Sequence, residues 1–458
     1  MRKMIIVLLL NILILAGSSE GRSPNVIILY TDDMGYGDVG CFGATDIKTP
    51  NIDALARSGI RLTDFYSAAP ICAPARAALL TGRYPTRAGM STKRNVPSCM
   101  GVPGMSTDEI TIAELAKDHG YATALFGKWH LGSTPDTQPN GQGFDLFFGH
   151  HASCIDSFSH MYYASEPYYH DLYRNRQEIW EDGQHMTDLI SRESIRFIQE
   201  NRERPFLIYV SYNTPHYPMV SPGRFVKMYD HLPVLRRYHA ALIAGIDESV
   251  GKIVNQLYRM NLTDNTLVFF ASDNGAANRS NRGEGGGSNA PLREYKRSLF
   301  DGGIRVPGIV SWPGTVPANE TRDQLAIAMD VFTTVADVIG ADLPKGKVMD
   351  GISWMPFLKN PDNPGHKTLF FEWNEQHAVR KGKWKVVRNG LIDIETKGRQ
   401  NRAVGGDYIF LSDMSADPGE RTNLYKQNSN VADQLLKMHD RWRASIAADK
   451  TASKSLQY

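Results

Sequence analysis

Residues 26–33 read Val-Ile-Ile-Leu-Tyr-Thr-Asp-Asp, which is an unbroken apolar run followed by a threonine and two aspartates. A short, continuous apolar run of this kind indicates a strand that is buried on both faces, as in parallel sheets. Similar runs recur, with helical patterns between them, at 121–126, 206–211, 266–271 and 306–312. This alternation predicts an α/β fold with a large mixed, mostly parallel sheet flanked by helices.

The segments between the runs carry helix signals. Thr49 and Pro50 begin a short helix that Gly59 ends, and Thr111 with Glu114 forms a capping box. Apolar residues recur at helical spacing through 235–257, which predicts one face of a long amphipathic helix.

The pattern changes after about residue 361. Apolar runs at 369–373, 384–387 and 408–411 follow one another without helical segments between them, and a final helical pattern covers 431–447. We expect a main α/β domain over 20–360. We expect residues 361–458 to form a small C-terminal subdomain, an antiparallel sheet plus one helix.

The first residues have the character of a secretory signal peptide. Arg2 and Lys3 precede an apolar stretch that ends in small residues, so residues 1–19 are predicted to be removed on export. An N-terminal membrane anchor is the alternative, but the apolar stretch is short for a bilayer. We expect a periplasmic or secreted protein, or a lysosomal one in a eukaryote, with no stable membrane span after cleavage.

Composition narrows the class further. The 458-residue chain is 42% apolar and 22% charged, which excludes collagen, coiled coils and wholesale disorder. Without Arg2 and Lys3 it holds 49 basic and 49 acidic residues, so no net charge points to nucleic acid. Four cysteines in an exported chain do not form a disulfide scaffold. If Cys72 has another role, one bridge is possible among Cys41, Cys99 and Cys154, with the pairing open.

Two of the predicted strands end in polar pairs. Asp32 and Asp33 follow the first strand, and Asp273 with Asn274 follows the strand at 266–271. Because ligands bind beyond the carboxyl ends of strands in open α/β sheets, both pairs should meet at one edge. Three carboxylates and an amide oxygen suit Ca²⁺ or Mg²⁺. The alternative for each pair alone is a turn or a helix cap.

A third motif reads Cys72-Ala-Pro74-Ala-Arg76 and continues as a helix that stops at Gly82. A cysteine at a helix N-terminus is expected to have a lowered pKa and to be reactive, whereas the alternative is a buried structural thiol. A soft thiolate is a poor ligand for a hard cation. A cysteine beside this metal is more reasonable if its sulfur is replaced by oxygen.

Taken together, these motifs resemble the type I sulfatases of the alkaline phosphatase superfamily, in particular arylsulfatases and N-acetylgalactosamine-6-sulfatases. The resemblance covers nearly the whole mature chain. In chain order, its motifs are Asp32-Asp33-Met-Gly-Tyr-Gly-Asp38, Cys72-x-Pro-x-Arg76 with Leu80-Thr-Gly-Arg83, Gly127-Lys-Trp-His-Leu-Gly132, Thr214-Pro-His216, Ser272-Asp-Asn-Gly275, Lys296, Asp301-Gly-Gly-Ile-Arg-Val-Pro307 and Asp417-Pro-Gly-Glu420. Ala73 departs from the Ser or Thr of many members, and Asp301 from their Glu.

The resemblance implies a role for each site residue. Cys72 would be converted to formylglycine by a formylglycine-generating or sulfatase-maturating enzyme, and its hydrated aldehyde would be the nucleophile. One Ca²⁺ would be held by Asp32, Asp33, Asp273, Asn274 and an oxygen of modified Cys72. Arg76 would stabilise the aldehyde hydrate, and Lys128 and Lys296 would hold the sulfate. His130 would act as base on the hydrate, and His216 would protonate the leaving alcohol. Lys128 and His130 would face one side of an extended segment.

The resemblance implies hydrolysis of sulfate esters, and we favour a sulfated carbohydrate as the substrate. Aromatic and polar side chains that suit a sugar are frequent between 150 and 173, although ordinary packing is the alternative. They are His150, His151, His160, Tyr162, Tyr163, Tyr168, Tyr169, His170 and Tyr173. A phosphodiesterase or phosphonate monoester hydrolase of the same superfamily is the second interpretation. A non-catalytic exported glycan-binding protein is the third.

Overall fold

The computed structural model of the chain describes residues 22–98, 100–278, 285–390 and 408–454. In these ranges the main sheet has ten strands. Their order is β13 (Glu320–Arg322), β2 (Ile60–Leu62), β12 (Gly308–Ser311), β11 (Thr266–Ser272), β1 (Asn25–Asp32), β10 (Phe206–Pro215), β4 (Ala122–Lys128), β5 (Leu146–His150), β8 (Tyr173–Arg174) and β9 (Gln177–Glu178).

The centre of the sheet is parallel. Strand β1 pairs in parallel with β11 and β10, and β4 pairs in parallel with β10 and β5. The outer strands include antiparallel pairs, such as β11 with β12 and β5 with β8. The predicted mixed, mostly parallel sheet is therefore confirmed. The strand at 306–312 was expected, but its antiparallel direction was not visible in the apolar run.

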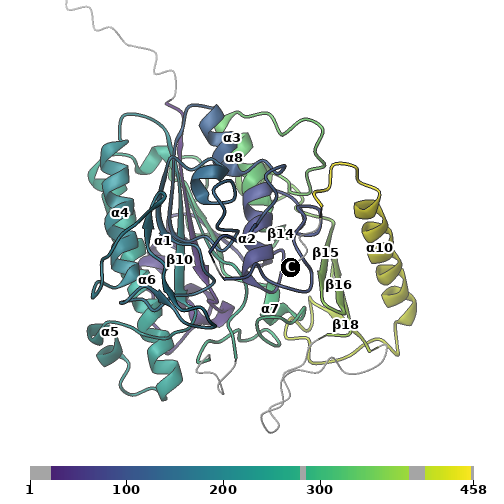
Figure 1. Ribbon diagram of the computed structural model, residues 1–458. Helices are drawn as coiled ribbons and strands as arrows, with labels where there is room; N and C mark the ends of the chain where they lie inside the picture. The colour runs from purple at the N-terminus through teal and green to yellow at the C-terminus, as the bar shows by residue number, and fades with distance from the viewer. Residues whose placement is uncertain (1–21, 99, 279–284, 391–407, 455–458) are drawn as a thin grey trace, which may run out of the picture.

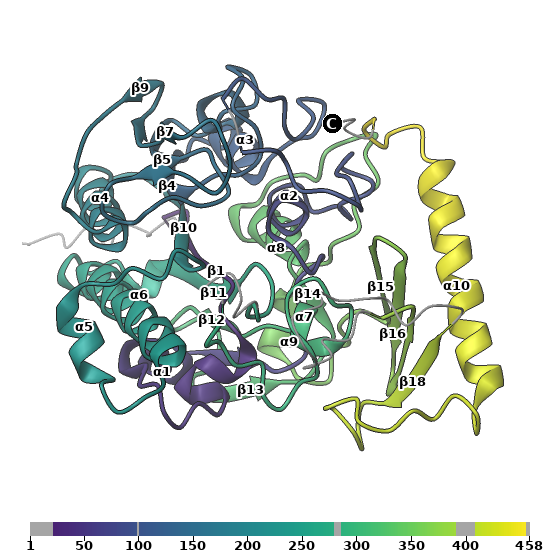
Figure 2. The same cartoon turned by 60° about the horizontal axis from the view of Figure 1, so that its bottom comes forward.

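Helices cover both faces of the sheet (Figure 1). One face carries α1 (Pro50–Arg57), α4 (Met186–Glu200), α5 (Gly223–Met228) and α6 (Val234–Arg259). The other face carries α2 (Cys72–Thr81), α3 (Ile112–Asp118) and α8 (Asp330–Ile339). The short helices α7 (Asp301–Ile304) and α9 (Met355–Lys359) lie near α8 (Figure 2). Two small sheets, β3 (Phe65–Tyr66) with β14 (Ala326–Ile327) and β6 (Met161–Tyr162) with β7 (Tyr169–His170), lie outside the main sheet.

Strand β1 explains why the apolar run decides the fold. All eight of its residues are buried. Ile27 and Leu29 pack into the core on the side of α4 and α6, whereas Val26, Ile28 and Tyr30 pack into the core on the side of α2 and α3. Side chains alternate between the two faces of a strand, so only an unbroken apolar run fills both cores.

The C-terminal part forms a second, antiparallel sheet beside the main body (Figure 2). It has four strands, β15 (Thr368–Trp373), β16 (Gln376–Lys381), β17 (Trp384–Arg388) and β18 (Ile409–Asp413), within the described ranges, and α10 (Ser429–Ala447) packs against it. Strand β16 was missed in the sequence because Arg380 and His377 interrupt its apolar pattern. The predicted antiparallel sheet with one helix is confirmed, and the exact domain boundary at 360/361 stays a prediction.

The sequence also led to predictions about a signal peptide, a disulfide bridge and membrane spans. The predicted signal peptide at residues 1–19 and Cys99 lie outside the described residues. Cys41, Cys72 and Cys154 are free thiols. In the portion of the chain that the structure describes, none of the helices is long and apolar enough to cross a bilayer.

Candidate active site

The carboxyl ends of four neighbouring parallel strands bring the predicted residues together. Asp32 is the last residue of β1 and Lys128 the last of β4. Asp273 and Asn274 follow β11, and His216 follows β10. In the register of the sheet, Asp32 lies opposite Pro215, and Thr31 lies opposite Ser272. The expectation that both polar pairs meet at one sheet edge is thus confirmed.

Helix α2 approaches this edge from the side. Its first residue is Cys72, and Arg76 follows one turn later on the same face. Every residue of α2 is buried, and the helix ends at Gly82, which has a left-handed φ of +69°. The helix therefore inserts the thiol and the guanidinium into the protein interior beside the carboxylates.

Each carboxylate of the site is paired with a cation. Lys128 Nζ lies 2.6 Å from Asp32, Lys296 Nζ lies 2.6 Å from Asp33, and Arg76 Nη2 lies 2.7 Å from Asp273. All six side chains are buried. Burial alone would raise the pKa of Asp33, but the charges of Lys296 and then His216 lower it to about 2. Burial and the charge of Asp32 raise the pKa of Asp273.

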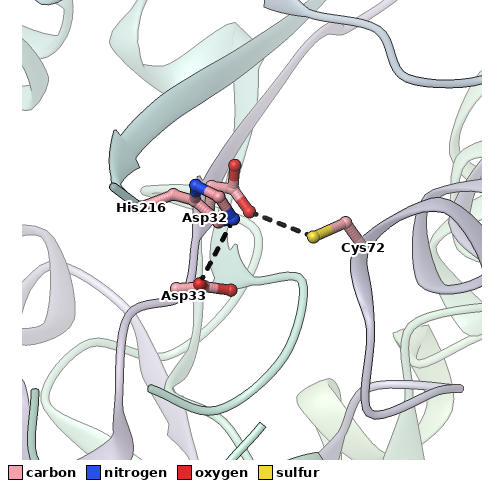
Figure 3. A group of neighbouring side chains, drawn as sticks. All are labelled: Asp32, Asp33, Cys72 and His216. Atoms are coloured by element: carbon pink, nitrogen blue, oxygen red, sulfur yellow. Dashed lines mark hydrogen bonds and ion pairs between the residues drawn. The ribbon is translucent and has the colours of Figure 1, made fainter. Parts of the chain in front are cut away.

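The sulfur of Cys72 points from α2 toward Asp32 (Figure 3). Its Sγ is 3.4 Å from Asp32 Oδ1 and 3.3 Å from Lys296 Nζ. Burial raises the pKa of the thiol well above its usual range, and the charge of Asp32 adds to this effect. The sequence expectation of a lowered pKa is therefore wrong, because burial and Asp32 outweigh the helix N-terminus and the two lysines.

Two histidines border the cluster. His216 Nε2 lies 3.6 Å from Asp33 Oδ2, while its Nδ1 lies 2.7 Å from the Tyr217 carbonyl oxygen, to which it donates. Burial and the charge of Lys296 lower the pKa of His216 to about 3. Burial, and then the charges of Lys128 and Arg76, lower the pKa of His130 well below its ordinary value.

His130 does not continue the strand of Lys128. Strand β4 ends at Lys128, and His130 has a φ of +58°, so the predicted extended segment is wrong at this point. The turn lets His130 Nε2 donate to the Val96 carbonyl oxygen at 3.0 Å. Its Nδ1 is buried and has no hydrogen-bond partner among the described residues, so it presents a free acceptor inside the protein.

The residues present suit a bound Ca²⁺ or Mg²⁺. Ligand atoms of Asp32, Asp33, Cys72 and His216 lie within 4.8 Å of one another. The Oδ1 atom of Asn274 is buried and has no hydrogen-bond partner among the residues that the structure describes, which is the state expected of a carbonyl oxygen reserved for a cation. Asp33, held at a left-handed φ of +68°, accepts from Asn274 Nδ2 at 2.6 Å. The donor set is dominated by hard oxygen atoms.

Supporting residues around the cluster were not identified from the sequence. Ser211, at the end of an expected strand, accepts from Arg76 Nη1 at 2.5 Å and donates to the Lys128 carbonyl oxygen at 2.6 Å. Gly275 and Gly302 let the turn after β11 pack against α7, because a Cβ on Gly275 would lie 1.8 Å from the Gly302 oxygen. A lone serine or glycine in a sequence does not indicate such a role. Gly275 and Gly302 do, however, lie within motifs quoted in the sequence analysis.

The aromatic and histidine-rich stretch between 150 and 173 is mostly internal. Its four histidines are buried, and a role for them toward a sugar stays a prediction. Tyr163 and Tyr168 are the most exposed rings of the stretch, at 44% and 59%. Two of the buried histidines lie beside carboxylates, His151 beside Asp171 and His170 beside Glu178.

The comparisons with known proteins agree with this geometry. The family model named Sulfatase matches residues 24–341, and the model named N-sulphoglucosamine sulphohydrolase, C-terminal, matches residues 294–446. The chain belongs to the sulfatase family. It is a sulfuric ester hydrolase, since named sulfatases match most of its length at about one third identity.

Three relatives illustrate how far the similarity of this sulfatase extends. N-acetylgalactosamine-6-sulfatase of Rattus norvegicus is 32% identical over 470 residues, which cover 94% of this chain and 88% of the relative. Arylsulfatase A of Homo sapiens is 32% identical over 440 residues, which cover 89% and 85%. The crystal structure of Ps i-CgsB in complex with k-i-k-neocarrahexaose has a TM-score of 0.83 and 30% identity, with 95% of each chain covered.

Proposed function

We propose that this sulfatase hydrolyses sulfate esters of a carbohydrate, with a formylglycine made from Cys72 and one bound Ca²⁺. The observation that carries the proposal is the position of Cys72 Sγ, 3.4 Å from Asp32 and 3.3 Å from Lys296, inside a cluster of three carboxylates and three cations. The carbohydrate class is supported by the names of relatives, an N-acetylgalactosamine-6-sulfatase and a structure in complex with k-i-k-neocarrahexaose.

The ligands of the Ca²⁺ would be oxygen atoms of Asp32, Asp33, Asp273 and Asn274, with an oxygen of modified Cys72. The hydrated aldehyde supplies an oxygen nucleophile, and the divalent ion supplies fixed positive charge beside it. The exported location, a maturating enzyme as partner, and the division into residues 1–19, 20–360 and 361–458 belong to the same proposal.

The lysines would change partners when the site is loaded. In the structure the charges of Asp32, Asp33 and Asp273 are balanced by Lys128, Lys296 and Arg76. Once the carboxylates serve as metal ligands, the ammonium groups of Lys128 and Lys296 turn to the sulfate oxygens. The site then has an excess of positive charge that favours an anionic ester and stabilises charge on its oxygens in the transition state.

The two histidines would move protons at defined atoms. His216 Nδ1–H is fixed by the Tyr217 carbonyl oxygen, so Nε2 is the atom that delivers a proton to the leaving alcohol. Its low pKa reflects burial and Lys296, and an anionic ester beside it would raise that pKa. His130 Nε2–H is fixed by the Val96 carbonyl oxygen, so Nδ1 is free to accept a proton from the aldehyde hydrate when sulfate leaves.

A desulfation screen tests the proposal. Protein from a host that has a maturating enzyme is assayed on defined sulfated mono- and disaccharides, with phosphodiesters and phosphonate monoesters as competing substrates. We expect sulfate release from at least one saccharide, with Cys72→Ala inactive. Mass spectrometry of the tryptic peptide 62–76 should show the aldehyde in place of the thiol. Turnover by protein with an intact Cys72 thiol, or a preference for phosphonate esters, would refute it.

A further inference from the structure

A second group of metal-ligating side chains lies outside the active site. It consists of His160, just before β6, His170 on β7, and Asp182, which follows β9. Each offers one ligand atom, and the three atoms lie within 4.8 Å of one another. Asp182 Oδ1 lies 3.7 Å from His160 Nδ1 and 3.8 Å from His170 Nε2. None of the three residues belongs to the catalytic cluster.

The two histidines of this group are buried with unsatisfied nitrogen atoms. His160 is 0% exposed and His170 is 7% exposed. Neither ring nitrogen of His160 has a hydrogen-bond partner in the described part of the chain, and His170 Nε2 has none either. Buried polar atoms are rarely left in this state, because burial without a partner is unfavourable. Two of these atoms, His160 Nδ1 and His170 Nε2, lie beside Asp182 Oδ1, and together they indicate a missing ligand.

The tautomer of His170 is already set for metal binding. Its Nδ1 lies 2.9 Å from Glu178 Oε1, so Nδ1–H donates to the carboxylate and Nε2 carries the lone pair that faces Asp182. A carboxylate behind a histidine is a common arrangement around zinc. Trp180 stacks on the His170 ring at 3.8 Å between centroids and 9° between planes, which holds the ring in place.

We propose that His160, His170 and Asp182 bind a divalent transition-metal ion of the Zn²⁺ type. Two nitrogen atoms and one carboxylate oxygen are a ligand set that suits Zn²⁺ rather than Ca²⁺. Two ligands that bind Zn²⁺ at tetrahedral angles lie about 3.3–3.4 Å apart, so the two separations from Asp182 need to shrink by only a few tenths of an ångström. The ligand atoms of the two histidines lie within 4.8 Å of each other and would also draw together around the ion. The Asp182 side chain is 55% exposed, which leaves an entry path and room for water as a fourth ligand.

The protonation state of His160 agrees with this role. Burial, and then the nearby His170, lowers the pKa of His160. Its imidazole is therefore neutral at neutral pH, which is the form that binds a metal.

The site would fasten the β6–β7 hairpin to the turn at 182–183. Without a metal, the turn is attached by the hydrogen bond from Gly183 N to the Phe158 carbonyl oxygen at 2.9 Å. The hairpin is linked to the segment beside His130 through Asp171, which accepts from the backbone N–H groups of His151 and Ala152. His130 N in turn donates to the His151 carbonyl oxygen at 3.2 Å. A metal here would stabilise the segment next to His130 without taking part in the chemistry.

Calorimetric titration with Zn²⁺ tests the proposal. The protein carries Cys72→Ser, which removes the thiol of the catalytic cluster, and is saturated with Ca²⁺, so that Zn²⁺ uptake there is suppressed. We expect one equivalent of Zn²⁺ with a dissociation constant in the micromolar range or below, and a Zn²⁺-dependent rise in Tm. Glu178→Gln should weaken Zn²⁺ binding about 10–100-fold.

Two variants and one control decide the outcome. Asp182→Asn and His170→Gln should each abolish the tight Zn²⁺ binding and the rise in Tm. Asp182→Asn is the more secure of the two, because this half-exposed side chain is not needed for the core. His231→Ala removes an exposed surface histidine and should leave both readouts unchanged. Absence of tight Zn²⁺ binding in the starting protein, or equal binding by the Asp182→Asn, His170→Gln double variant, would overturn the proposal.

Discussion

His216 and His130 differ in the ring nitrogen that is left for the proposed proton transfer, Nε2 in His216 and Nδ1 in His130. Their proposed roles differ, so substitution of each histidine should have a different effect on turnover. The proposed role of His216 is to protonate the leaving oxygen from Nε2. Its Nδ1 is occupied by the Tyr217 carbonyl oxygen. A sugar alkoxide is a poor leaving group that needs the proton, whereas a nitrophenolate carries much of the charge itself. The consequence of losing His216 should therefore depend on the leaving group.

We expect His216→Ala to lower turnover of a sulfated sugar by about 10²–10⁴-fold, and turnover of an aryl sulfate much less. His130→Ala should impair both substrates alike, since release of sulfate from modified Cys72 is common to them. The measurement is the ratio of turnover on the two substrate types for each variant, with a melting curve as the check of folding. Equal loss on both substrates in His216→Ala would assign the acid role to another residue, with Lys296 next.

Another histidine, which lies away from the proposed metal ligands, makes the stability of the protein depend on pH. His366 Nε2 lies 2.7 Å from Asp330 Oδ1, and the Asp330 side chain is completely buried. Burial alone would lower the pKa of His366, but the charge of Asp330 outweighs it and raises the pKa. Because the folded pKa is above the unfolded one, the stabilisation is fully present below the unfolded pKa of about 6.5. It is lost as the pH rises through the folded pKa.

His366→Gln keeps a hydrogen-bonding side chain but not the charge. We expect it to lower the free energy of unfolding by roughly 1.5–3 kcal/mol at acidic pH, where the wild-type imidazolium is paired. The difference should shrink as the pH rises well above 6.5, about the ordinary pKa of histidine. Urea unfolding of both proteins across this pH range checks the sign. A difference that grows with pH would contradict it.

At the scale of single elements, helix α2 depends on the glycine at its end. Gly82 and Gly340 both end a helix with a left-handed φ, +69° and +72°. A Cβ on Gly340 would meet open space, whereas on Gly82 it would lie 2.7 Å from Met349 Cε and 3.0 Å from Phe332 Cβ. The two positions therefore share the backbone strain and differ in packing.

We expect Gly340→Ala to cost about 1–2 kcal/mol of stability through the left-handed backbone alone. Gly82→Ala should cost about 1–3 kcal/mol more, because Phe332 on α8 must move. Chemical denaturation of the two variants beside the wild type gives both values. Equal losses would show that the space around Gly82 adapts freely.

The sequence predicted elements well wherever one periodicity holds. The unbroken runs became β1, β4, β10 and β11, and the capping box of Thr111 and Glu114 is present at α3. Prediction from the sequence failed where tertiary contacts decide the local backbone geometry. The polar positions of β16 hid a strand whose partners lie far along the chain, and the left-handed turn at His130 depends on a bond to Val96.

On the scale of the whole molecule, the site is assembled from segments that lie 263 residues apart in the sequence, as with Asp33 and Lys296. The motifs converge because the parallel strands β1, β4, β10 and β11 place four of them at one edge of the sheet. From the strand ends, the sequence predicted that the pairs Asp32-Asp33 and Asp273-Asn274 meet, whereas Lys128 and His216 were expected at the site only from the family resemblance. It did not predict the raised pKa of Cys72, because burial of the thiol depends on how α2 packs against the sheet.

The C-terminal sheet is joined to the catalytic part by a buried ionic group. Lys385 Nζ, on β17, lies 2.6 Å from Asp301 Oδ1 on α7 and 3.0 Å from Glu420 Oε1, and all three side chains are 0% exposed. Asp301 N also donates to Glu420 Oε2 at 2.6 Å. Because α7 packs against the turn after β11, this group connects the second sheet to the sheet edge that holds Asp32 and Asp273.

Lys385→Met should destabilise the whole molecule strongly, by about 3–5 kcal/mol, since it removes the cation beside the buried Glu420 and leaves Asp301 with Arg305, at 3.4 Å. Burial already raises the pKa of Glu420, with the charge of Asp301 adding to it, and loss of Lys385 would raise it further. The folded variant then binds more protons than the unfolded chain, so its stability should fall as the pH rises from acidic to neutral. Lys383→Met is the matched control, because that lysine is half-exposed and pairs with Asp413 at the surface. Urea unfolding at several pH values should show a large, pH-dependent loss in the free energy of unfolding for Lys385→Met and little change for Lys383→Met. Similar small losses in both variants would mean that the buried ionic group does not hold the two sheets together.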